Sequence, residues 1–249
     1  MKTLTLYMNA ALKIGKNLSK FSTYAYKPTS KKELQDIIKI RIKKEGNNCN
    51  LNDIDVSLIE DMSTVFFRSR FNGDISKWNV RNATDMSNMF IGSEFNGDIS
   101  DWDVSNVNKM MGMFSRSKFT GDISRWNVSN VTNMANMFSF SYFNQDISDW
   151  DVSKVKSMYN TFHSSLFNKP IGDWDVRNVV DMSFMFSESK FNQDLSKWDV
   201  SNVKDMSGMF SMSKFNQDIS DWKIKEDCDT NHMFISCKIN KEYKPRQLQ

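Results

Sequence analysis

Aspartates recur every 24 residues in this chain of 249 residues, and such a column could bind calcium. One column contains Asp74, Asp98, Asp122, Asp146, Asp194 and Asp218, each two residues after an asparagine or threonine. Calcium needs six to eight oxygen ligands, which one aspartate and one neighbour per repeat cannot supply. Pro170 also replaces the aspartate in one repeat. We therefore predict that these carboxylates accept hydrogen bonds from backbone amides in turns.

Methionine, histidine and cysteine are the other side chains that could bind a metal or act in catalysis. A column of methionines could bind a soft metal, but its helix-like spacing and apolar neighbours predict a core position (Met86, Met110, Met134, Met158, Met182 and Met206). His163 and His232 occupy different columns, without a second ligand at metal-binding spacing. Nucleophile-elbow, phosphate-loop and dinucleotide-binding motifs are missing from the sequence. We expect no catalytic residue, no metal and no cofactor, and hence a protein that is not an enzyme.

A second set of aspartates flanks the tryptophans and is the best candidate for a binding site. In a short extended segment the residues on either side of an inward tryptophan point outward. Like charges stacked on adjacent strands are unfavourable, so these aspartates serve either solubility or the binding of a basic partner. The predicted partner-binding residues are Asp101, Asp103, Asp149, Asp151, Asp173, Asp175, Asp199 and Asp221. Nucleic acid is an unlikely ligand for this surface, because the charge is negative and stacking aromatics are missing.

The elements that must position these residues belong to a repeat of 24 residues, F-N-x-D-I-S-x-W-x-V-x-N-V-x-x-M-x-x-M-F followed by four more. All seven tryptophans keep the period: Trp78, Trp102, Trp126, Trp150, Trp174, Trp198 and Trp222. The alternation in I-S-x-W-x-V predicts a short strand, and the spacing in V-x-x-M-x-x-M-F predicts a short helix. Asn82 and Asp85 resemble a capping pair at the start of such a helix. The predicted fold is an α/β repeat solenoid, a parallel stack of 24-residue turns.

The repeats divide the chain into three parts. Residues 1–46 are a basic N-terminal segment, with a predicted helical cap over residues 29–46. Its apolar residues, expected to cover the open end of the stack, are Leu34, Ile37, Ile38 and either Ile40 or Ile42. Residues 47–238 hold about eight repeats, of which the first and the last are degenerate, as terminal repeats of a solenoid are expected to be. Residues 239–249 are a basic tail.

Charge, cysteine content and hydropathy limit which partners and which cellular compartment are expected. The net charge is +3, but residues 1–46 hold eleven basic and three acidic residues, so the ends could attract an anion such as nucleic acid. Cys49, Cys228 and Cys237 lack metal-binding spacing, and Cys228 and Cys237 could be either paired or free. No apolar run has the length of a transmembrane helix. The N-terminus lacks a convincing signal peptide or lipobox cysteine, which favours the cytoplasm slightly.

The repeat FNGDISDWDVSNV, followed by the spaced methionines and phenylalanine, resembles the repeats of BspA-like, mycoplasma-type surface lipoproteins. The segment SKKELQDIIKIRIKKEGNNCNLNDIDVS resembles the lead-in to those repeats. The resemblance covers about residues 29–240. It implies a leucine-rich-repeat-like, right-handed stack, display on a cell surface and adhesion to proteins.

These observations predict a non-enzymatic scaffold that binds a protein partner through the outer strand face of the solenoid. In one reading the protein is an adhesin or surface-type module, as the resemblance implies. In the alternative reading it is an intracellular effector or inhibitor, phage- or symbiont-like, that blocks a basic protein site with its acidic face.

Overall fold

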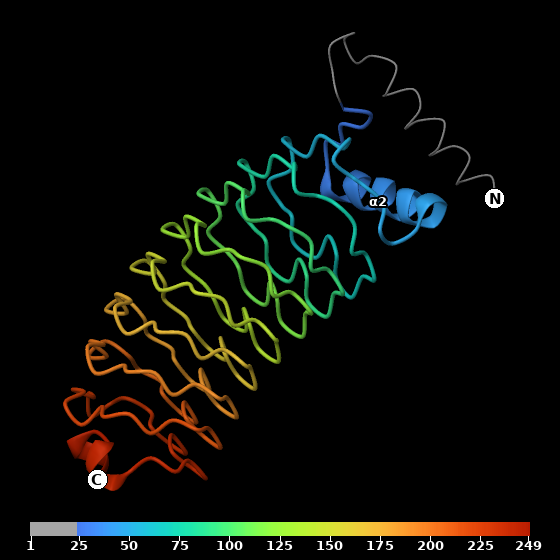
Figure 1. Cartoon of the computed structure of the whole chain (residues 1–249). Coiled ribbons are helices and arrows are strands. Elements are labelled where there is room, and N and C mark those ends of the chain that lie inside the picture. The colour runs from blue at the N-terminus through green and yellow to red at the C-terminus, as the bar shows by residue number, and fades with distance from the viewer. Residues whose placement is uncertain (1–23) are drawn as a thin grey trace.

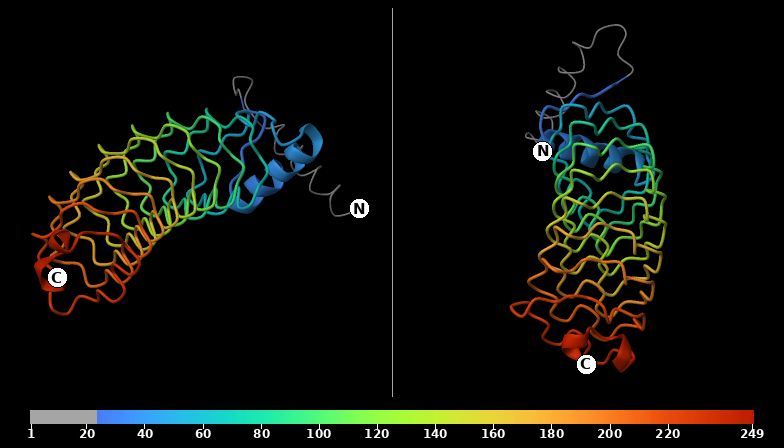
Figure 2. Two further views of the ribbon diagram at one scale, coloured as in Figure 1. Left: turned by 60° about the horizontal axis from the view of Figure 1, so that its bottom comes forward. Right: turned by 90° about the vertical axis from the view of Figure 1, so that its left-hand side faces the viewer.

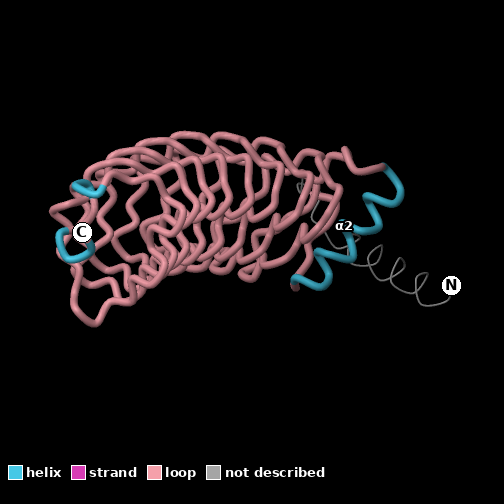
Figure 3. Tube along the Cα trace, turned by 90° about the horizontal axis from the view of Figure 1, so that it is seen from below, coloured by secondary structure: helices cyan, strands magenta, loops and turns pink. Residues whose placement is uncertain are grey.

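The computed structural model describes residues 24–249 and shows a bent rod of stacked coils (Figures 1 and 2). Its helices are α2 (Lys31–Glu45), η2 (Lys241–Tyr243) and η3 (Arg246–Leu248), and all three lie at the ends of the rod (Figure 3). Equivalent side chains of adjacent coils meet, as the hydroxyls of Ser115 and Ser139 do at 3.1 Å, which confirms a repeat solenoid. Residues 1–23 of the predicted N-terminal segment lie outside the described residues.

Helix α2 covers the N-terminal end of the stack, where a helical cap is expected. The Ser30 side chain accepts a hydrogen bond from the Glu33 backbone N–H at the start of the helix, and Gly46 ends it in a positive-φ conformation. Leu34, Ile37 and Ile38 are buried on the face that meets the first coil. Arg41 ties the helix to that coil, because its guanidinium bonds the Asp53 carboxylate at 2.7 Å and the Asn50 carbonyl at 2.9 Å.

Each coil is a series of tight turns, as the coil of residues 71–94 illustrates. The backbone N–H groups of Trp78, Ala83, Met89 and Ser93 each bond the carbonyl three residues before them. We call residues 75–80 and the equivalent segment of every other coil the Trp side. Residues 86–94 and their equivalents form the turn side.

The predicted helix of the repeat is wrong: the turn side consists of two consecutive turns. Asn88 and Gly92, the third residues of these turns, have φ values of 57° and 61°, which place them in the left-handed region. Alternate N–H groups then point to the next coil, where Asn88 bonds the Met111 carbonyl at 2.7 Å and Phe90 bonds the Met113 carbonyl at 2.9 Å. In a helix those donors would bond within the coil, so bonding between coils excludes the helix.

The predicted strand and the predicted capping pair also differ from the structure. Residues 75–80 contain a turn, and most of the parallel pairing lies instead in the column that precedes the methionines, from Asp61 and Asp85 to Asp229. Within residues 24–249 these are isolated parallel bridges, so the stack is parallel but holds no continuous strand. The Asn82 amide donates to the Ser57 carbonyl of the preceding coil at 2.8 Å rather than capping a helix.

The core contains the tryptophan, phenylalanine and methionine columns, as the repeat predicts. Phe66 and Phe90 stack with their ring centroids 5.5 Å apart, and the same contact continues to Phe210 and Phe234 at 5.8 Å. Each Trp indole N–H donates to a carbonyl 27 residues earlier in the preceding coil, as Trp150 does to Ile123 at 3.1 Å. Tryptophan therefore joins neighbouring coils by packing and by a buried hydrogen bond.

The C-terminal end is covered in part by the tail. The Ile219 N–H bonds the Tyr243 carbonyl at 2.9 Å, and Arg246 pairs with Asp221. Tyr243 and Leu248 pack against the core while remaining partly exposed, and Phe234 is half-buried, unlike its equivalents in the preceding coils. The last coil therefore ends the stack with a thinner cover than α2 provides at the other end.

Two substitutions of Trp150 separate the contribution of tryptophan packing from that of the buried hydrogen bond. Trp150→Ala should lower the free energy of unfolding by about 3–5 kcal/mol, because it leaves a cavity in the middle of the rod. Trp150→Phe should cost less, about 1–3 kcal/mol, because it keeps most of the packing and leaves the Ile123 carbonyl unpaired. Urea unfolding measures both, and a loss below about 1 kcal/mol for the alanine variant would contradict the core position.

Candidate protein-binding surfaces

The eight predicted aspartates all lie on the Trp side, in two columns that behave differently. Asp101, Asp173 and Asp221 belong to the outer column, and their side chains are 79–83% exposed. Asp149 occupies the same column and is also exposed. These four carboxylates point into solvent from different coils, as a binding surface requires.

The inner column is engaged with the backbone of its own coil. One carboxylate oxygen of each member accepts a hydrogen bond from the N–H two residues later, at 3.0–3.2 Å; the members are Asp103, Asp151, Asp175 and Asp199. Bonds from the Ser105 hydroxyl and backbone lower the pKa of Asp103, and bonds from the Arg177 guanidinium and backbone lower the pKa of Asp175. The inner column therefore contributes to turn structure as well as to surface charge.

Cations from neighbouring coils offset the repulsion between the stacked carboxylates. Arg125 pairs with Asp101 at 3.0 Å, and Lys197 pairs with Asp173 at 2.7 Å. Arg177 contacts Asp175 at 2.8 Å within its own coil. Such exposed pairs contribute about 0–1 kcal/mol each, so a partner's cation can replace them at low cost. Among residues 24–249, Asp149 has neither a cation within 4.0 Å nor a hydrogen-bond donor, whereas Asp151 and Asp199, which also lack a cation, accept bonds from backbone N–H groups. Asp149 is therefore the most available of the eight.

A shallow hollow of about 240 Å³ opens on the same side, and its polar lining includes three of the predicted aspartates. Asp173, Asp175 and Asp199 line it together with Arg177 and Lys197. Gly172 also lines it and stands where the other repeats carry serine, in the repeat in which Pro170 replaces aspartate. These two substitutions were the sequence signal for the hollow.

Gly172 is required by the close approach of the next coil. A Cβ atom at this position would lie 2.6 Å from the Asp194 carbonyl oxygen. The serine of the other repeats cannot be restored here without moving the backbone.

The aspartates equivalent to Asp146 accept hydrogen bonds from backbone amides in turns, as predicted. The Asp146 carboxylate accepts a bond from the Ser148 N–H at 2.9 Å, and the equivalent bond is present at Asp74, Asp98, Asp122, Asp194 and Asp218. Residues 24–249 contain no cluster of three or more histidine, cysteine, aspartate or glutamate side chains suited to a metal ion.

The other candidate ligands are accounted for by packing. The methionines of the predicted column are buried in the core. Cys228 and Cys237 are not bonded to each other, and burial raises the pKa of Cys228 to about 11, so its thiol stays protonated at neutral pH. The His163 ring contacts Phe140 edge to face at 4.9 Å, and burial lowers the pKa of this histidine.

A second surface was missed by reasoning from the sequence. Nine of the eleven exposed large hydrophobic side chains lie on the turn side, namely Phe67, Met111, Phe140, Tyr142, Tyr159, Leu166, Phe184, Met212 and Ile235. They occupy columns in which other repeats carry serine, asparagine, glycine or a charged residue. Those exceptions to the repeat were the available signal.

A family profile described as "Mycoplasma protein of unknown function, DUF285" matches residues 36–142 and again residues 139–245. The chain belongs to this family. The two matches lie in tandem and cover most of α2 and all of the coils. No curated protein and no solved structure matches the chain. The helices of residues 24–249 include none that is long and apolar enough to cross a bilayer.

The turn-forming aspartates predict a specific sensitivity to acid. Bonds from backbone N–H groups lower the pKa of Asp98, Asp122, Asp146 and Asp194. A carboxylate with a lowered folded-state pKa stabilises the fold above its unfolded pKa of about 3.9, and this stabilisation is lost as pH falls through the folded pKa. The free energy of unfolding, measured by urea titration, should therefore fall below about pH 4.

The matched variant replaces these four aspartates by asparagine. Its amides can still cap the turns, as Asn127 does for the Ser129 N–H at 3.1 Å. It should be less stable than the wild type at pH 7, because a neutral amide oxygen accepts a weaker hydrogen bond than a carboxylate does, and it should lose less stability than the wild type on acidification. An unchanged pH profile would mean that these carboxylates contribute nothing to acid sensitivity.

Proposed function

We propose that this chain is a non-enzymatic scaffold that binds a basic surface of another protein through the carboxylates of its Trp side. The observation that carries the proposal is the outer column, in which Asp101, Asp149, Asp173 and Asp221 stand exposed at a regular spacing. Solenoid faces of this kind are extended and easily varied without disturbing the core.

The charge of the Trp side supports a basic partner. Its described coils carry ten aspartates against four lysines and arginines. Complementary charge speeds association and fixes the orientation of a complex. A partner that contacted several coils at once would gain from the regular spacing of the column.

The hollow beside Gly172 also lies on the Trp side, and it can accommodate one basic side chain of a partner. A lysine or arginine of the partner would meet Asp173, Asp175 and Asp199 there. It would compete with Lys197 and Arg177 for the same oxygens, which already accept bonds at 2.7 and 2.8 Å. Because those pairs are exposed, this exchange costs little.

Two settings fit this activity. A BspA-like adhesin with a right-handed, leucine-rich-repeat-like winding is the first, and the unvarying repeat length together with the lead-in around α2 supports that kinship. The second is an effector or inhibitor inside a cell that blocks a basic site. The identity of the partner separates the two settings.

The test is a pull-down from native cell material, with captured proteins identified by mass spectrometry. The wild type is compared with a variant in which Asp149, Asp151, Asp173 and Asp175 become asparagine. A matched control removes the same charge elsewhere, through asparagine at Asp98, Asp122, Asp146 and Asp194. We expect a basic partner to be captured by the wild type and the control and to be lost, by at least tenfold, with the first variant.

Equal capture by all three baits would contradict the proposal. It would leave the carboxylates of the Trp side with a role in solubility alone.

A further inference from the structure

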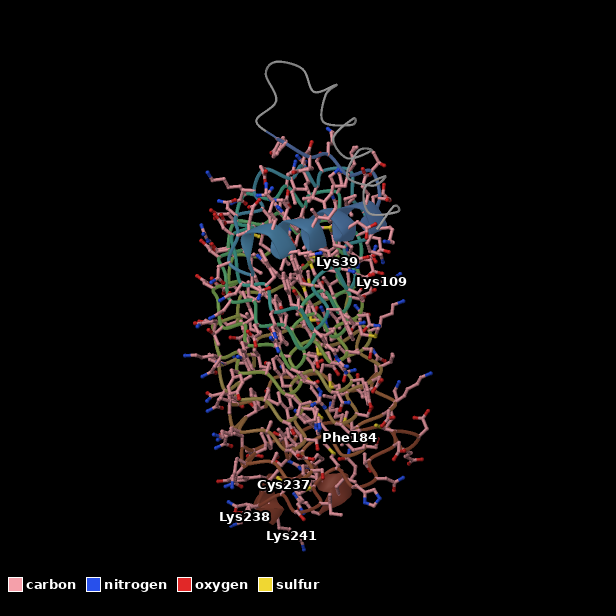
Figure 4. All side chains as sticks on the ribbon, turned by 90° about the vertical axis from the view of Figure 1, so that its right-hand side faces the viewer. Lys39, Lys109, Phe184, Cys237, Lys238 and Lys241 are labelled. Carbon is pink, nitrogen blue, oxygen red and sulfur yellow. The ribbon has the colours of Figure 1, made fainter. Side chains whose placement is uncertain are left out.

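Five consecutive coils, from residue 95 to residue 214, each expose at least one large apolar side chain on the turn side. We call Met111, Phe140, Tyr159, Phe184 and Met212 the apolar strip. Met212 is 60% exposed, and the other four are 37–39% exposed. Figure 4 labels Phe184, which lies between Lys109 and Cys237 along the rod. Single exposed hydrophobic residues are ordinary, but a contiguous row of them is typical of an interaction surface.

Contacts with neighbouring coils hold two members of the strip. The Arg116 guanidinium lies over the Phe140 ring at 3.9 Å, and that ring meets the edge of His163 in the next coil. The Phe184 ring covers Gly208, so closely that a Cβ atom at Gly208 would overlap it. Phe140 and Phe184 are therefore held in place before any partner binds.

Backbone strain is the second, independent observation. Phe140, Phe184 and Met212 have φ values of 54°, 54° and 55°. The left-handed region costs a residue with a side chain roughly 1 kcal/mol or more relative to glycine. Five other repeats place asparagine or glycine in the column of Phe184, at Asn88, Gly112, Asn136, Asn160 and Gly208, and the two terminal repeats place Thr64 and His232 there. Every coil adopts positive φ at the two positions equivalent to Phe140 and Phe184, so the conformation belongs to the fold. The choice of a large, exposed apolar residue there is what the fold does not require, and such local conflicts are expected at functional sites.

The charge of the turn side points to an acidic partner. Its described coils carry seven lysines and arginines against two glutamates. Both glutamates are engaged, Glu94 with Lys118 at 3.6 Å and Glu188 with the Ser164 hydroxyl at 3.0 Å. Lys190 and Lys214 flank the strip, are exposed and have no acidic partner within 4.0 Å among residues 24–249.

The spacing of the coils suits an α-helix. Successive phenylalanine rings in one column lie 5.5–5.8 Å apart along the rod, and a helix rises about 5.4 Å per turn. A helix that lay along the rod would place one side chain per turn opposite each coil. Five coils correspond to a helix of about 15 residues at roughly 1.5 Å per residue.

We infer that the apolar strip and its basic flank bind an acidic amphipathic helix of a protein partner. The apolar face of the helix covers the strip, and its acidic residues meet Lys190, Lys214 and Arg116. Such helix-in-groove recognition depends on apolar anchors at every third or fourth residue. This inference shares with the proposed function only the idea that the chain binds protein, because it places a different partner on a different side.

The experiment uses the full chain and a defined probe. The probe is a fluorescent 16-residue helical peptide with leucine at its first, fourth, eighth, eleventh and fifteenth positions and mainly glutamate elsewhere. A second peptide carries lysine in place of glutamate. Fluorescence anisotropy at low salt is measured on the variant in which Asp149, Asp151, Asp173 and Asp175 become asparagine, because the Trp side of the wild type is proposed to bind basic partners. On this variant the acidic peptide should bind at least tenfold more tightly than the basic one.

Two pairs of variants locate the binding. Phe184→Asn with Met212→Gly should weaken binding of the acidic peptide at least tenfold while leaving the melting temperature equal or higher, because asparagine and glycine suit positive φ. Its control, Leu58→Ser with Val180→Ser, removes exposed apolar side chains outside the turn side and should bind as the wild type does. Lys190→Glu with Lys214→Glu should also weaken binding tenfold, whereas Lys77→Glu with Lys223→Glu on the Trp side should not.

Three outcomes would overturn the inference. The first is equal binding of the two peptides to the asparagine variant of the Trp side, or binding of neither. The second is loss of binding with the asparagine variant of the Trp side, which would place the peptide there. The third is occupation of the strip by the chain itself, shown by tighter peptide binding after removal of residues 1–23, or by sedimentation of the wild type, but not the Phe184→Asn, Met212→Gly variant, as a dimer. None of these outcomes affects the pull-down that tests the Trp side, so the two proposals can fail separately.

Discussion

The hydrogen bonds between the turn sides of adjacent coils are the constraint on which the rest of the molecule depends. Every second N–H of residues 86–92 donates to the next coil, and the same pattern recurs at each junction down to Met206–Met212 and the last coil. These bonds require two left-handed residues per coil, four positions apart. Because an extra residue would break the register of every donor, the coil length cannot vary and all columns stay aligned.

Alignment of the columns explains why the core could be predicted from the sequence and the secondary structure could not. Trp150, Phe138 and Met134 are inward in any fold with this period. The spacing of Val107, Met110, Met113 and Phe114, however, fits one face of a helix and equally fits two consecutive turns, since both bring every third or fourth residue inward. The asparagines and glycines at 88, 112, 136, 160 and 208 were the signal for turns, because they favour positive φ.

The candidate surface on the Trp side was predicted in position but not in detail. Alternation around each tryptophan was sufficient to place Asp101 and Asp149 outside. It could not show that Arg125 and Lys197 reach the carboxylates of the preceding coil, because those contacts depend on the conformations of side chains in two different coils. The turn side escaped prediction for a related reason: Phe184 was assigned to a helix and Phe140 to the loop after it, and neither assignment predicted a row of exposed apolar residues.

The two sides of the rod are opposite in charge and different in chemistry, although one repeat generates both. Columns that must stabilise the coil, such as Asp146 and Asn96, keep their residue types because their side chains bond backbone groups. The side chains of Asp149, Phe184 and Met212 make no hydrogen bonds to the backbone of residues 24–249. The residue types at these exposed positions therefore do not affect coil formation in the same way. A stack built like this can change its binding residues one coil at a time, while the hydrogen bonds between coils keep the spacing of those residues constant. Phe140 and Phe184 are the clearest instance, because they occupy left-handed positions that accept many other residue types in the other coils.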